Sequence, residues 1–284
     1  MLAEKYLFRQ ALRPFSFSVA LVVCLTGILA ANAVEQINLF IAVLILAAGL
    51  LLQAGVNLIN DYSDLSFRAV KTDAQSCKRI RQNFRFGLIC LLVAAVIGLF
   101  LIYRSGWVLL LYAVIGILGA LGYTLEPVNY KRRGLAVFLV FWLMGVLMVT
   151  GSYYILTLQL NYEIFLISVP VSIYTSLLLL SNEIRDYESD SDAGIKTLSV
   201  RIGYERAEKL YLILLAAIYV GALSVSFLTT LTHAWLVVFS LPVALLPIKY
   251  IPSAPEDRKP VTPLTGKSFL LFGVLYCLAL VISI

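Results

Sequence analysis

Acidic residues crowd into two places in this sequence, and both places carry the same short pattern. Half of the 16 Asp and Glu residues lie in or near segments 57–64 and 182–192. Each segment begins Asn-x-Ile-x-Asp-Tyr and places a further Asp three or four residues after the first. Residues at this spacing share one face of a helix. The pattern therefore predicts one amide and two carboxylates on one side of each helix end: Asn57, Asp61 and Asp64, then Asn182, Asp186 and Asp190.

These side chains are suited to binding a hard cation. Carboxylates placed this close repel one another unless a cation neutralises them. Mg²⁺ prefers octahedral oxygen coordination and shares its ligands between carboxylates and substrate phosphates. We therefore predict Mg²⁺ ligands at all six positions.

Basic residues near both segments supply the opposite charge. They are Arg68 and Lys71 after the first segment, Lys196 and Arg201 after the second, and Lys131 in a Lys-Arg-Arg run. A diphosphate that arrives with Mg²⁺ needs metal on some oxygens and Lys or Arg on the others. We predict that these five residues bind a diphosphate, with Asn57 and Asn182 beside it.

A solvated, charged loop at a helix end is the plain alternative for each of these residues. Glu188 and Asp192 lie off the shared face, and for them we favour this alternative. The paired Asp residues are different, because the helix macrodipole opposes acids at a helix C-terminus. A local stabilising role therefore explains them poorly. Each basic residue has its own alternative, a role in membrane topology.

Membrane-spanning helices are expected to position these residues. Of the 284 residues, 61% are hydrophobic and 13% are charged, whereas about 25% charged is usual in soluble domains. The apolar runs approach the length of about 20 residues that crosses a bilayer. We predict an all-α polytopic membrane protein, one domain over 1–284. Its nine expected spans are approximately 15–34, 37–58, 86–103, 107–123, 135–156, 164–180, 210–228, 234–248 and 269–284.

The basic residues also predict the orientation, because Lys and Arg are retained on the cytoplasmic side. With nine spans and a cytosolic N-terminus, Arg104 is the only one of the 22 Lys and Arg residues that falls outside. Both acidic segments then lie at cytosolic helix ends, and the C-terminus lies outside. We expect the cytoplasmic membrane of a bacterium or archaeon. This topology explains the net charge of +6, so the charge does not indicate nucleic-acid binding.

Cysteine and histidine indicate no further chemistry. The four Cys residues show neither metal-ligand nor redox spacing. His233, the single histidine, falls in a short loop on the expected outer face. The mechanism must therefore work without a histidine base on the cytosolic side.

The second acidic segment resembles the second Asp motif of the UbiA superfamily of intramembrane aromatic prenyltransferases. The likeness extends over residues 182–203. The first segment and the stretch 123–135 match less fully, and the nine-helix plan agrees over essentially the whole chain. Arg68 stands where the family often has a third Asp, and Asp73 is the nearest substitute.

Three features look most like the 1,4-dihydroxy-2-naphthoate polyprenyltransferases of menaquinone synthesis. They are the Tyr-Thr…Pro…Arg-Gly-Leu loop within 123–135, the Ala-Gly-x-Lys-Thr-Leu sequence at 193–198, and Gly-Ser-Tyr-Tyr at 151–154. The resemblance implies a UbiA-like helical bundle. It also implies Mg²⁺-dependent transfer of a polyprenyl group from its diphosphate to an aromatic acceptor, and dihydroxynaphthoate is the acceptor that we expect.

The resemblance also implies roles for single residues. Mg²⁺ on the four Asp side chains would neutralise the leaving diphosphate. Tyrosine rings at 62, 123 and 187 would shelter an allylic cation, and Tyr123 and Lys131 join the catalytic set. The tail would reach the lipid through a lateral opening between helices.

Other functions remain open at this point. A transporter is the rival of a different class, since acids in membrane proteins often line transport paths. Transporter sites lie near the bilayer midplane, whereas both segments here lie at the cytosolic margin. A non-catalytic scaffold does not explain the repeated acidic pattern. Among enzymes, the alternative is another acceptor such as 4-hydroxybenzoate.

Overall fold

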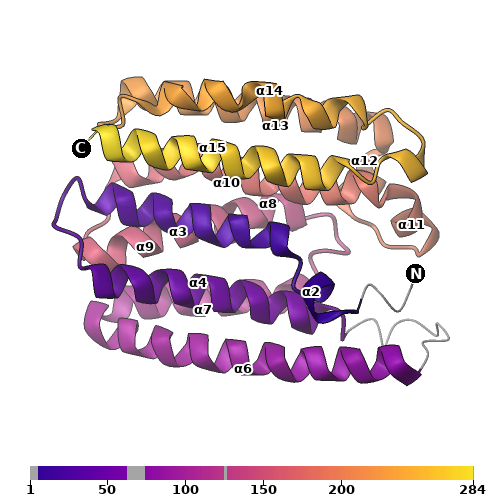
Figure 1. The fold of residues 1–284 in the computed structure, drawn as a ribbon, viewed down its shortest axis with the longest axis horizontal. Helices are drawn as coiled ribbons and strands as arrows, with labels where there is room; N and C mark the ends of the chain where they lie inside the picture. The colour runs from indigo at the N-terminus through magenta and orange to yellow at the C-terminus, as the bar shows by residue number, and fades with distance from the viewer. Residues whose placement is uncertain (1–5, 63–73, 125–126, 284) are drawn as a thin grey trace.

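A computed structural model describes residues 6–62, 74–124 and 127–283, and this part of the chain contains helices and turns without a strand. Most helices run along one direction of an elongated bundle (Figure 1). The N-terminal half contains α2 (Phe8–Ala11), η1 (Pro14–Ser16), α3 (Phe17–Ala31), α4 (Leu39–Asn60), α6 (Ala74–Ser105), α7 (Trp107–Thr124), α8 (Ala136–Val140), the π-helical turn η2 (Phe141–Val146) and α9 (Leu147–Thr157). The C-terminal half contains α10 (Tyr162–Arg185), α11 (Tyr187–Asp192), α12 (Leu198–Ile202), α13 (Tyr204–Leu228), η3 (Ala234–Ser240), α14 (Leu241–Ala244), η4 (Leu246–Lys249), η5 (Pro255–Asp257) and α15 (Val261–Ser283).

The helices make this chain an integral membrane protein, and the expected all-α fold is confirmed. Within the described residues, seven helices are long and apolar enough to cross a membrane. Two further apolar helices, Trp107–Tyr123 and Ala234–Lys249, are shorter. The expected count of nine spans therefore stays a prediction. Helix α2 lies at one end of the bundle, and α15 ends at the other (Figure 1).

Several helices begin earlier than hydropathy predicts. The expected span 86–103 belongs to α6, which begins at Ala74, and the span 269–284 belongs to α15, which begins at Val261. Hydropathy detects only the part of a helix inside the hydrocarbon core, and polar residues continue the helix beyond it. The expected span 234–248 is a chain of short 3₁₀ and α segments. Pro242 and Pro247 each lie in the first turn of such a segment, where a missing N–H costs little.

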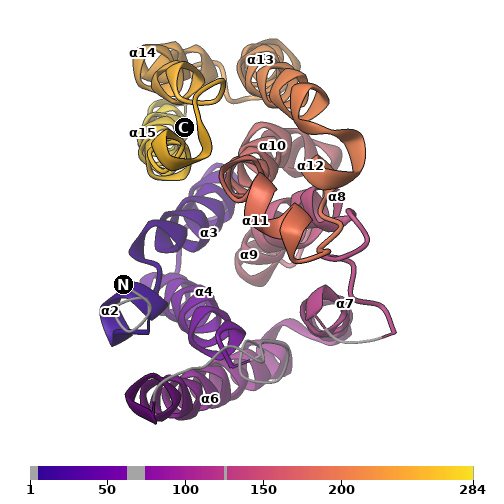
Figure 2. The same ribbon diagram turned by 90° about the vertical axis from the view of Figure 1, so that its right-hand side faces the viewer.

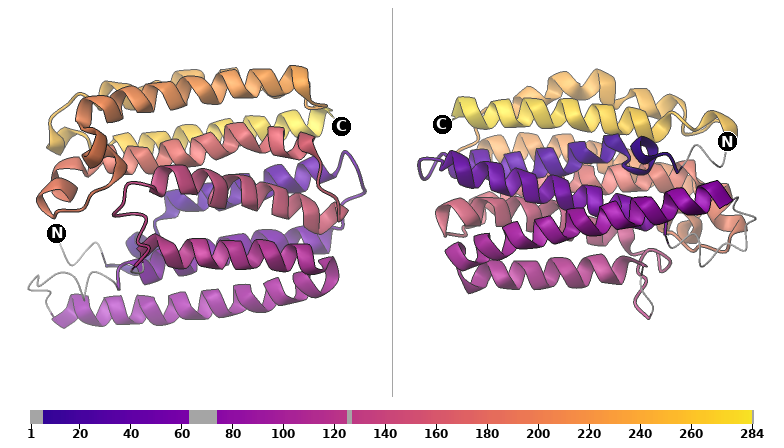
Figure 3. Two further views of the ribbon diagram at one scale, coloured as in Figure 1. Left: turned by 180° about the vertical axis from the view of Figure 1, so that it is seen from behind. Right: turned by 60° about the horizontal axis from the view of Figure 1, so that its bottom comes forward.

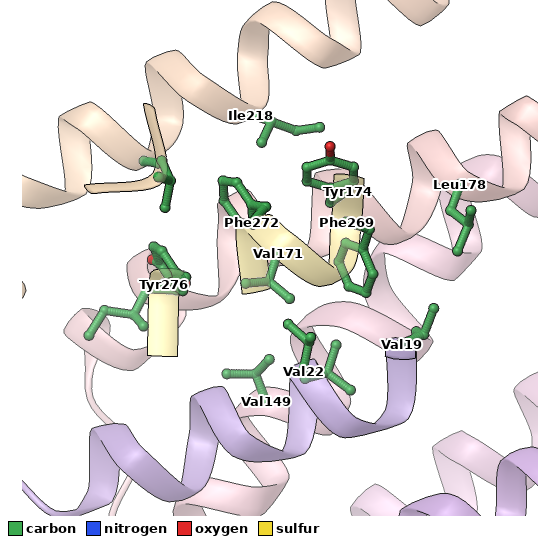
Figure 4. Packing of buried hydrophobic residues seen from close by; sticks show 14 of the residues in the cluster. Val19, Val22, Val149, Val171, Tyr174, Leu178, Ile218, Phe269, Phe272 and Tyr276 are labelled. Atoms are coloured by element: carbon green, nitrogen blue, oxygen red, sulfur yellow. The ribbon is translucent and has the colours of Figure 1, made fainter. Parts of the chain in front are cut away.

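Helix α10 forms the centre of the bundle, and α6 forms its edge. The most apolar stretch of α10 is 72% buried, whereas that of α6 is 17% buried. Figure 2 shows α10 between α3, α9 and α13, and α6 lies on the outside in the views of Figure 1, Figure 2 and Figure 3. Val171 and Tyr174 of α10 pack against Phe269 and Phe272 of α15 and Val22 of α3 (Figure 4).

Small residues let the inner helices approach closely, as is typical of membrane bundles. A Cβ added at Gly145, within η2, would lie 2.3 Å from the Ser172 Oγ atom of α10. At Gly27 of α3, an added Cβ would lie 2.2 Å from the Val149 carbonyl oxygen of α9. Buried tyrosines also join helices through hydrogen bonds: Tyr211 Oη lies 2.8 Å from Thr265 Oγ1, and Tyr276 Oη donates to the Ile167 carbonyl at 2.8 Å.

The segments of chemical interest lie at one end of the bundle, the end near α2. The C-terminal ends of α4 and α10 both lie at this end, as do α2, α11 and α12 (Figure 1, right-hand side). The packed core therefore brings both acidic segments to the same end of the molecule.

Candidate functional site

Asp61 is a buried acid directly after α4. It is the residue that caps the C-terminus of α4, and it is 2% exposed. Arg13 Nη2 lies 3.2 Å from Asp61 Oδ1. A buried carboxylate requires a counter-charge, and in this structure the N-terminal segment supplies it.

Asn57 holds the same N-terminal segment through its amide. Its Nδ2 donates to the Leu12 carbonyl at 2.8 Å and to Ser16 Oγ at 2.6 Å, and Gln53 Nε2 donates to its Oδ1 at 3.2 Å. Arg13, between the two acceptors, has a left-handed backbone with φ of 50°. Asn57 and Asp61 thus fix residues 12–16 over the end of α4.

The second segment is a bent helix rather than the uninterrupted one that the spacing predicted. Helix α10 ends at Arg185, Asp186 has φ of −97° and ψ of 11°, and α11 begins at Tyr187. The amides of Asp186 and Asp190 still donate to the carbonyls of Asn182 and Asp186, at 3.0 and 2.9 Å. The helical spacing of Asn182, Asp186 and Asp190 therefore continues through the bend.

Asp186 is paired with its neighbour in sequence. Arg185 Nε lies 2.8 Å from Asp186 Oδ1, and Arg185 Nη2 lies 2.6 Å from Oδ2. The two side chains are 28% and 42% exposed, and exposed pairs of this kind are weak. Asn182 Nδ2 donates back to the Leu178 carbonyl at 3.3 Å, which leaves the amide oxygen as the atom suited to a cation.

Tyr123 lies between the two acidic segments. Its hydroxyl lies in the electrostatic field of Glu183 and Asp190 from the second segment and of Arg13, the partner of Asp61. Lys131 Nζ lies 5.9 Å from the centre of the Tyr123 ring. The C-terminal end of α7 therefore lies near charged residues of the second segment and near the arginine that pairs with Asp61.

The loop after α7 returns to the Tyr123 ring through backbone hydrogen bonds. The Tyr130 amide donates to the Gly122 carbonyl at 2.9 Å, and the Lys131 amide donates to the Tyr123 carbonyl at 3.3 Å. The Tyr130 ring packs edge-on against Tyr123 with centroids 5.3 Å apart. Burial raises the pKa of Tyr130 above its usual value, so its phenol remains protonated at neutral pH.

Arg201 braces two loops at this end, whereas Lys196 is exposed. Arg201 Nε donates to the Lys196 carbonyl at 3.1 Å, and its Nη2 donates to the Arg132 carbonyl at 3.4 Å. Gly134 has φ of +72°, and a Cβ there would lie 2.5 Å from the Arg201 Cδ atom. Arg201 thus joins the loop of Lys131 to that of Lys196.

Glu183 was not singled out by the sequence reasoning, although it belongs to the second segment. It is 5% exposed, and its Oε2 accepts a hydrogen bond from the Ser199 amide at 3.0 Å. Ser199 Oγ donates to the Glu183 carbonyl at 3.2 Å. The carboxylate therefore satisfies a free N–H in the first turn of α12. The Thr-x-Ser sequence at 197–199 is the signal that could have indicated a helix start.

Glu188 differs from the expected solvated acid, because both of its oxygens accept from Arg258 Nη1, at 2.8 and 2.9 Å. Asp192 is exposed, as expected for a solvated acid. Asp64, Arg68, Lys71 and Asp73 lie outside the described residues.

Comparison with known proteins decides the family. The model of the UbiA prenyltransferase family matches residues 20–281. This chain belongs to the UbiA prenyltransferase family.

Relatives of this UbiA-family chain include two bacterial proteins named 1,4-dihydroxy-2-naphthoate octaprenyltransferase. The protein from Bacillus subtilis is 26% identical over 96% of this chain and 92% of its own length. The one from Mycobacterium tuberculosis is 30% identical over 82% of each. The fold is also that of a UbiA homologue from Archaeoglobus fulgidus, determined with GPP and Mg²⁺ bound. Its TM-score is 0.64 at 16% identity, over 96% of this chain and 99% of that one.

The oxygen donors of this UbiA-family chain fit Mg²⁺ by their chemistry. Within residues 6–62, 74–124 and 127–283, no three Asp, Glu, His or Cys side chains already stand together as a metal site. Instead, Asp61 and Asp186 each pair with an arginine. Carboxylate and amide oxygens are ligands that Mg²⁺ accepts, and a divalent ion can replace an arginine as counter-charge. The predicted resemblance to the UbiA family is confirmed, and a prenyltransferase family argues against the transporter alternative.

Proposed function

We propose that this protein transfers a polyprenyl group from an allylic polyprenyl diphosphate to 1,4-dihydroxy-2-naphthoate. One observation supports the proposal: Asp61 after α4 and Asp186 after α10 lie at the same end of a membrane bundle, where Lys131 lies near the Tyr123 ring and charges near both acids act on the Tyr123 hydroxyl. Relatives with the naphthoate octaprenyltransferase name cover nearly the whole chain, which favours this acceptor over 4-hydroxybenzoate. We further propose that residues 1–284 act as one domain.

The first requirement of the reaction is a place for the diphosphate. Mg²⁺, when bound, would neutralise the leaving group as its C–O bond breaks and the diphosphate departs with the electron pair. Asp61, Asp64, Asp186 and Asp190 would hold the ion, with Asn57 and Asn182 beside them. The cations that face the remaining oxygens would be Arg68, Lys71, Lys131, Lys196 and Arg201.

The second requirement is shelter for the allylic cation. The Tyr123 ring offers a π face in a position that both acidic segments influence. A ring carbon of the acceptor then forms the new C–C bond to the cation. For dihydroxynaphthoate, loss of its carboxylate as CO₂ returns the electron pair to the ring, so no histidine base is needed.

We propose that this end of the bundle faces the cytosol of a bacterium or archaeon and that the C-terminus lies outside. The distribution of Lys and Arg supports this orientation. Labelling of Cys77 with a membrane-impermeant thiol reagent tests it. Cys77 should react only after the membrane is opened, and labelling from outside would reverse the orientation.

An acceptor panel tests the proposed function. Purified protein in lipid with Mg²⁺ and a labelled prenyl diphosphate should convert dihydroxynaphthoate to its prenylated, decarboxylated product, identified by mass spectrometry. Preference for 4-hydroxybenzoate would refute the acceptor, and failure with every aromatic acceptor would refute the function.

A further inference from the structure

Arg258 is a buried arginine that fixes the segment carrying the second pair of acids. It lies between η5 and α15, and its side chain is 8% exposed. Its Nη1 donates to both Glu188 oxygens, at 2.8 and 2.9 Å, and its Nε donates to the Ser253 carbonyl at 2.7 Å. The guanidinium also lies 4.1 Å from the centre of the Tyr204 ring. A buried arginine with these partners is held in one orientation.

The Tyr204 ring connects Arg258 to a second point on the same segment. Its edge contact with Tyr187 brings the ring centroids to 5.2 Å, and its hydroxyl donates to the Ile251 carbonyl. Tyr187 and Glu188 are the first two residues of α11. Arg258 and Tyr204 therefore hold both residues that immediately follow Asp186.

Helix α11 depends on such contacts for its orientation. It has only six residues and follows the bend at Asp186. An isolated helix this short is not stable in water. Arg258 comes from the connection between η4 and α15, far away in sequence, and thus ties α11 to a different part of the bundle.

We infer that Arg258 is a positioning residue, which acts through Glu188 and Tyr204 to orient Asp186 and Asp190 for binding Mg²⁺ and diphosphate. The inference rests on the proposed function. Glu188 is held by a buried arginine from a distant part of the chain, whereas Asp186 pairs with a more exposed arginine next to it in sequence. We therefore assign Glu188 to holding α11 and Asp186 to binding metal. Partners that orient metal ligands typically contribute 10- to 100-fold to metal affinity.

Mn²⁺ binding in the presence of inorganic diphosphate, measured by electron paramagnetic resonance on the purified chain, tests this role directly. We expect Arg258→Lys and Glu188→Gln each to weaken Mn²⁺ binding by about 10-fold, the lower end of that range. The double variant should weaken binding by less than the product of the two single effects, because the two residues share one contact. Glu188→Gln keeps the shape of the side chain, so this variant alone still tests the inference if an Arg258 variant does not fold.

Glu163→Gln is the matched control. Glu163 Oε1 accepts from the Thr230 amide at 2.5 Å, at the opposite end of α10. This variant also weakens a contact between a helix and a loop, so it should lower the thermal stability about as much as Arg258→Lys or Glu188→Gln. It should nevertheless leave the Mn²⁺ affinity unchanged.

Three results would overturn the inference. Unchanged Mn²⁺ affinity in both Arg258→Lys and Glu188→Gln would show that the contact between these residues only stabilises the fold. Tighter binding in an Arg258 variant would make Glu188 itself a metal ligand. A wild-type chain that neither binds Mn²⁺ nor transfers a prenyl group would refute the proposed function as well, whereas an active wild type with insensitive variants refutes the inference alone.

Discussion

The buried pair of Arg13 and Asp61 gives a stability prediction that depends on Mg²⁺. Arg13→Ala removes one charged partner of the Asp61 carboxylate, which is 2% exposed. Breaking a fully buried pair costs about 3 to 5 kcal/mol. The Arg13 side chain is 34% exposed, so water screens part of the interaction. We therefore expect a loss of about 1 to 2 kcal/mol in the free energy of unfolding without metal.

Thermal unfolding in detergent, followed by tryptophan fluorescence, measures this loss. For a chain of this size, 1 to 2 kcal/mol corresponds to a decrease in Tm of about 2 to 4 °C. Saturating Mg²⁺ with diphosphate should reduce the difference from wild type, because the ion then neutralises Asp61 in both proteins. Binding to the folded state alone raises stability in this way.

Arg185→Ala is the control, because it removes the partner of a much more exposed acid, Asp186. Exposed pairs contribute about 0.2 to 1 kcal/mol, so its Tm should decrease by less than that of Arg13→Ala. Equal losses in the two variants would refute the argument from burial. An equal gain from Mg²⁺ in wild type and Arg13→Ala would show that Asp61 does not receive the ion.

Three further variants and one control test other parts of the structure. Lys131→Met should raise the KM for the prenyl diphosphate by about 10-fold, since one charge-assisted contact is lost; an unchanged KM in steady-state assays would remove Lys131 from the diphosphate site. Glu183→Ala should lower the free energy of unfolding by about 1 to 2 kcal/mol, because an amide in the first turn of α12 loses its acceptor; denaturant titration measures this, and an unchanged midpoint would contradict it. Gly145→Ala should cost about 1 to 3 kcal/mol, because the new Cβ would meet Ser172 Oγ at 2.3 Å. Gly98→Ala, which faces open space, should leave the Tm unchanged or raise it, and similar losses in both variants would contradict the packing argument.

The sequence predicted the family and the all-α fold because both follow from local patterns. Apolar length identifies spans without knowledge of their packing. The repeated Asn-x-Ile-x-Asp-Tyr pattern placed an amide and an acid one helical turn apart, and the backbone hydrogen bonds from Asp186 to Asn182 agree with that spacing.

Long-range contacts could not be predicted in the same way. Nothing near Asp61 in sequence indicates that Arg13 is its partner, and nothing near Glu188 indicates Arg258. These pairs form because the bundle brings distant helix ends together, and periodicity contains no such information. The bend at Asp186 was missed for a related reason: α11 leaves the axis of α10 to reach contacts supplied by Tyr204 and Arg258.

The central claim is that both acidic segments act together in Mg²⁺-dependent prenyl transfer. A single assay tests it most directly: formation of prenylated dihydroxynaphthoate by wild type, Asp61→Asn and Asp186→Asn, each with Mg²⁺ and with EDTA. We predict product only from wild type with Mg²⁺, a decrease of at least about 100-fold in either variant, and recovery of wild-type activity when Mg²⁺ is returned. Full activity in either variant, or product formation that survives EDTA, would contradict the account.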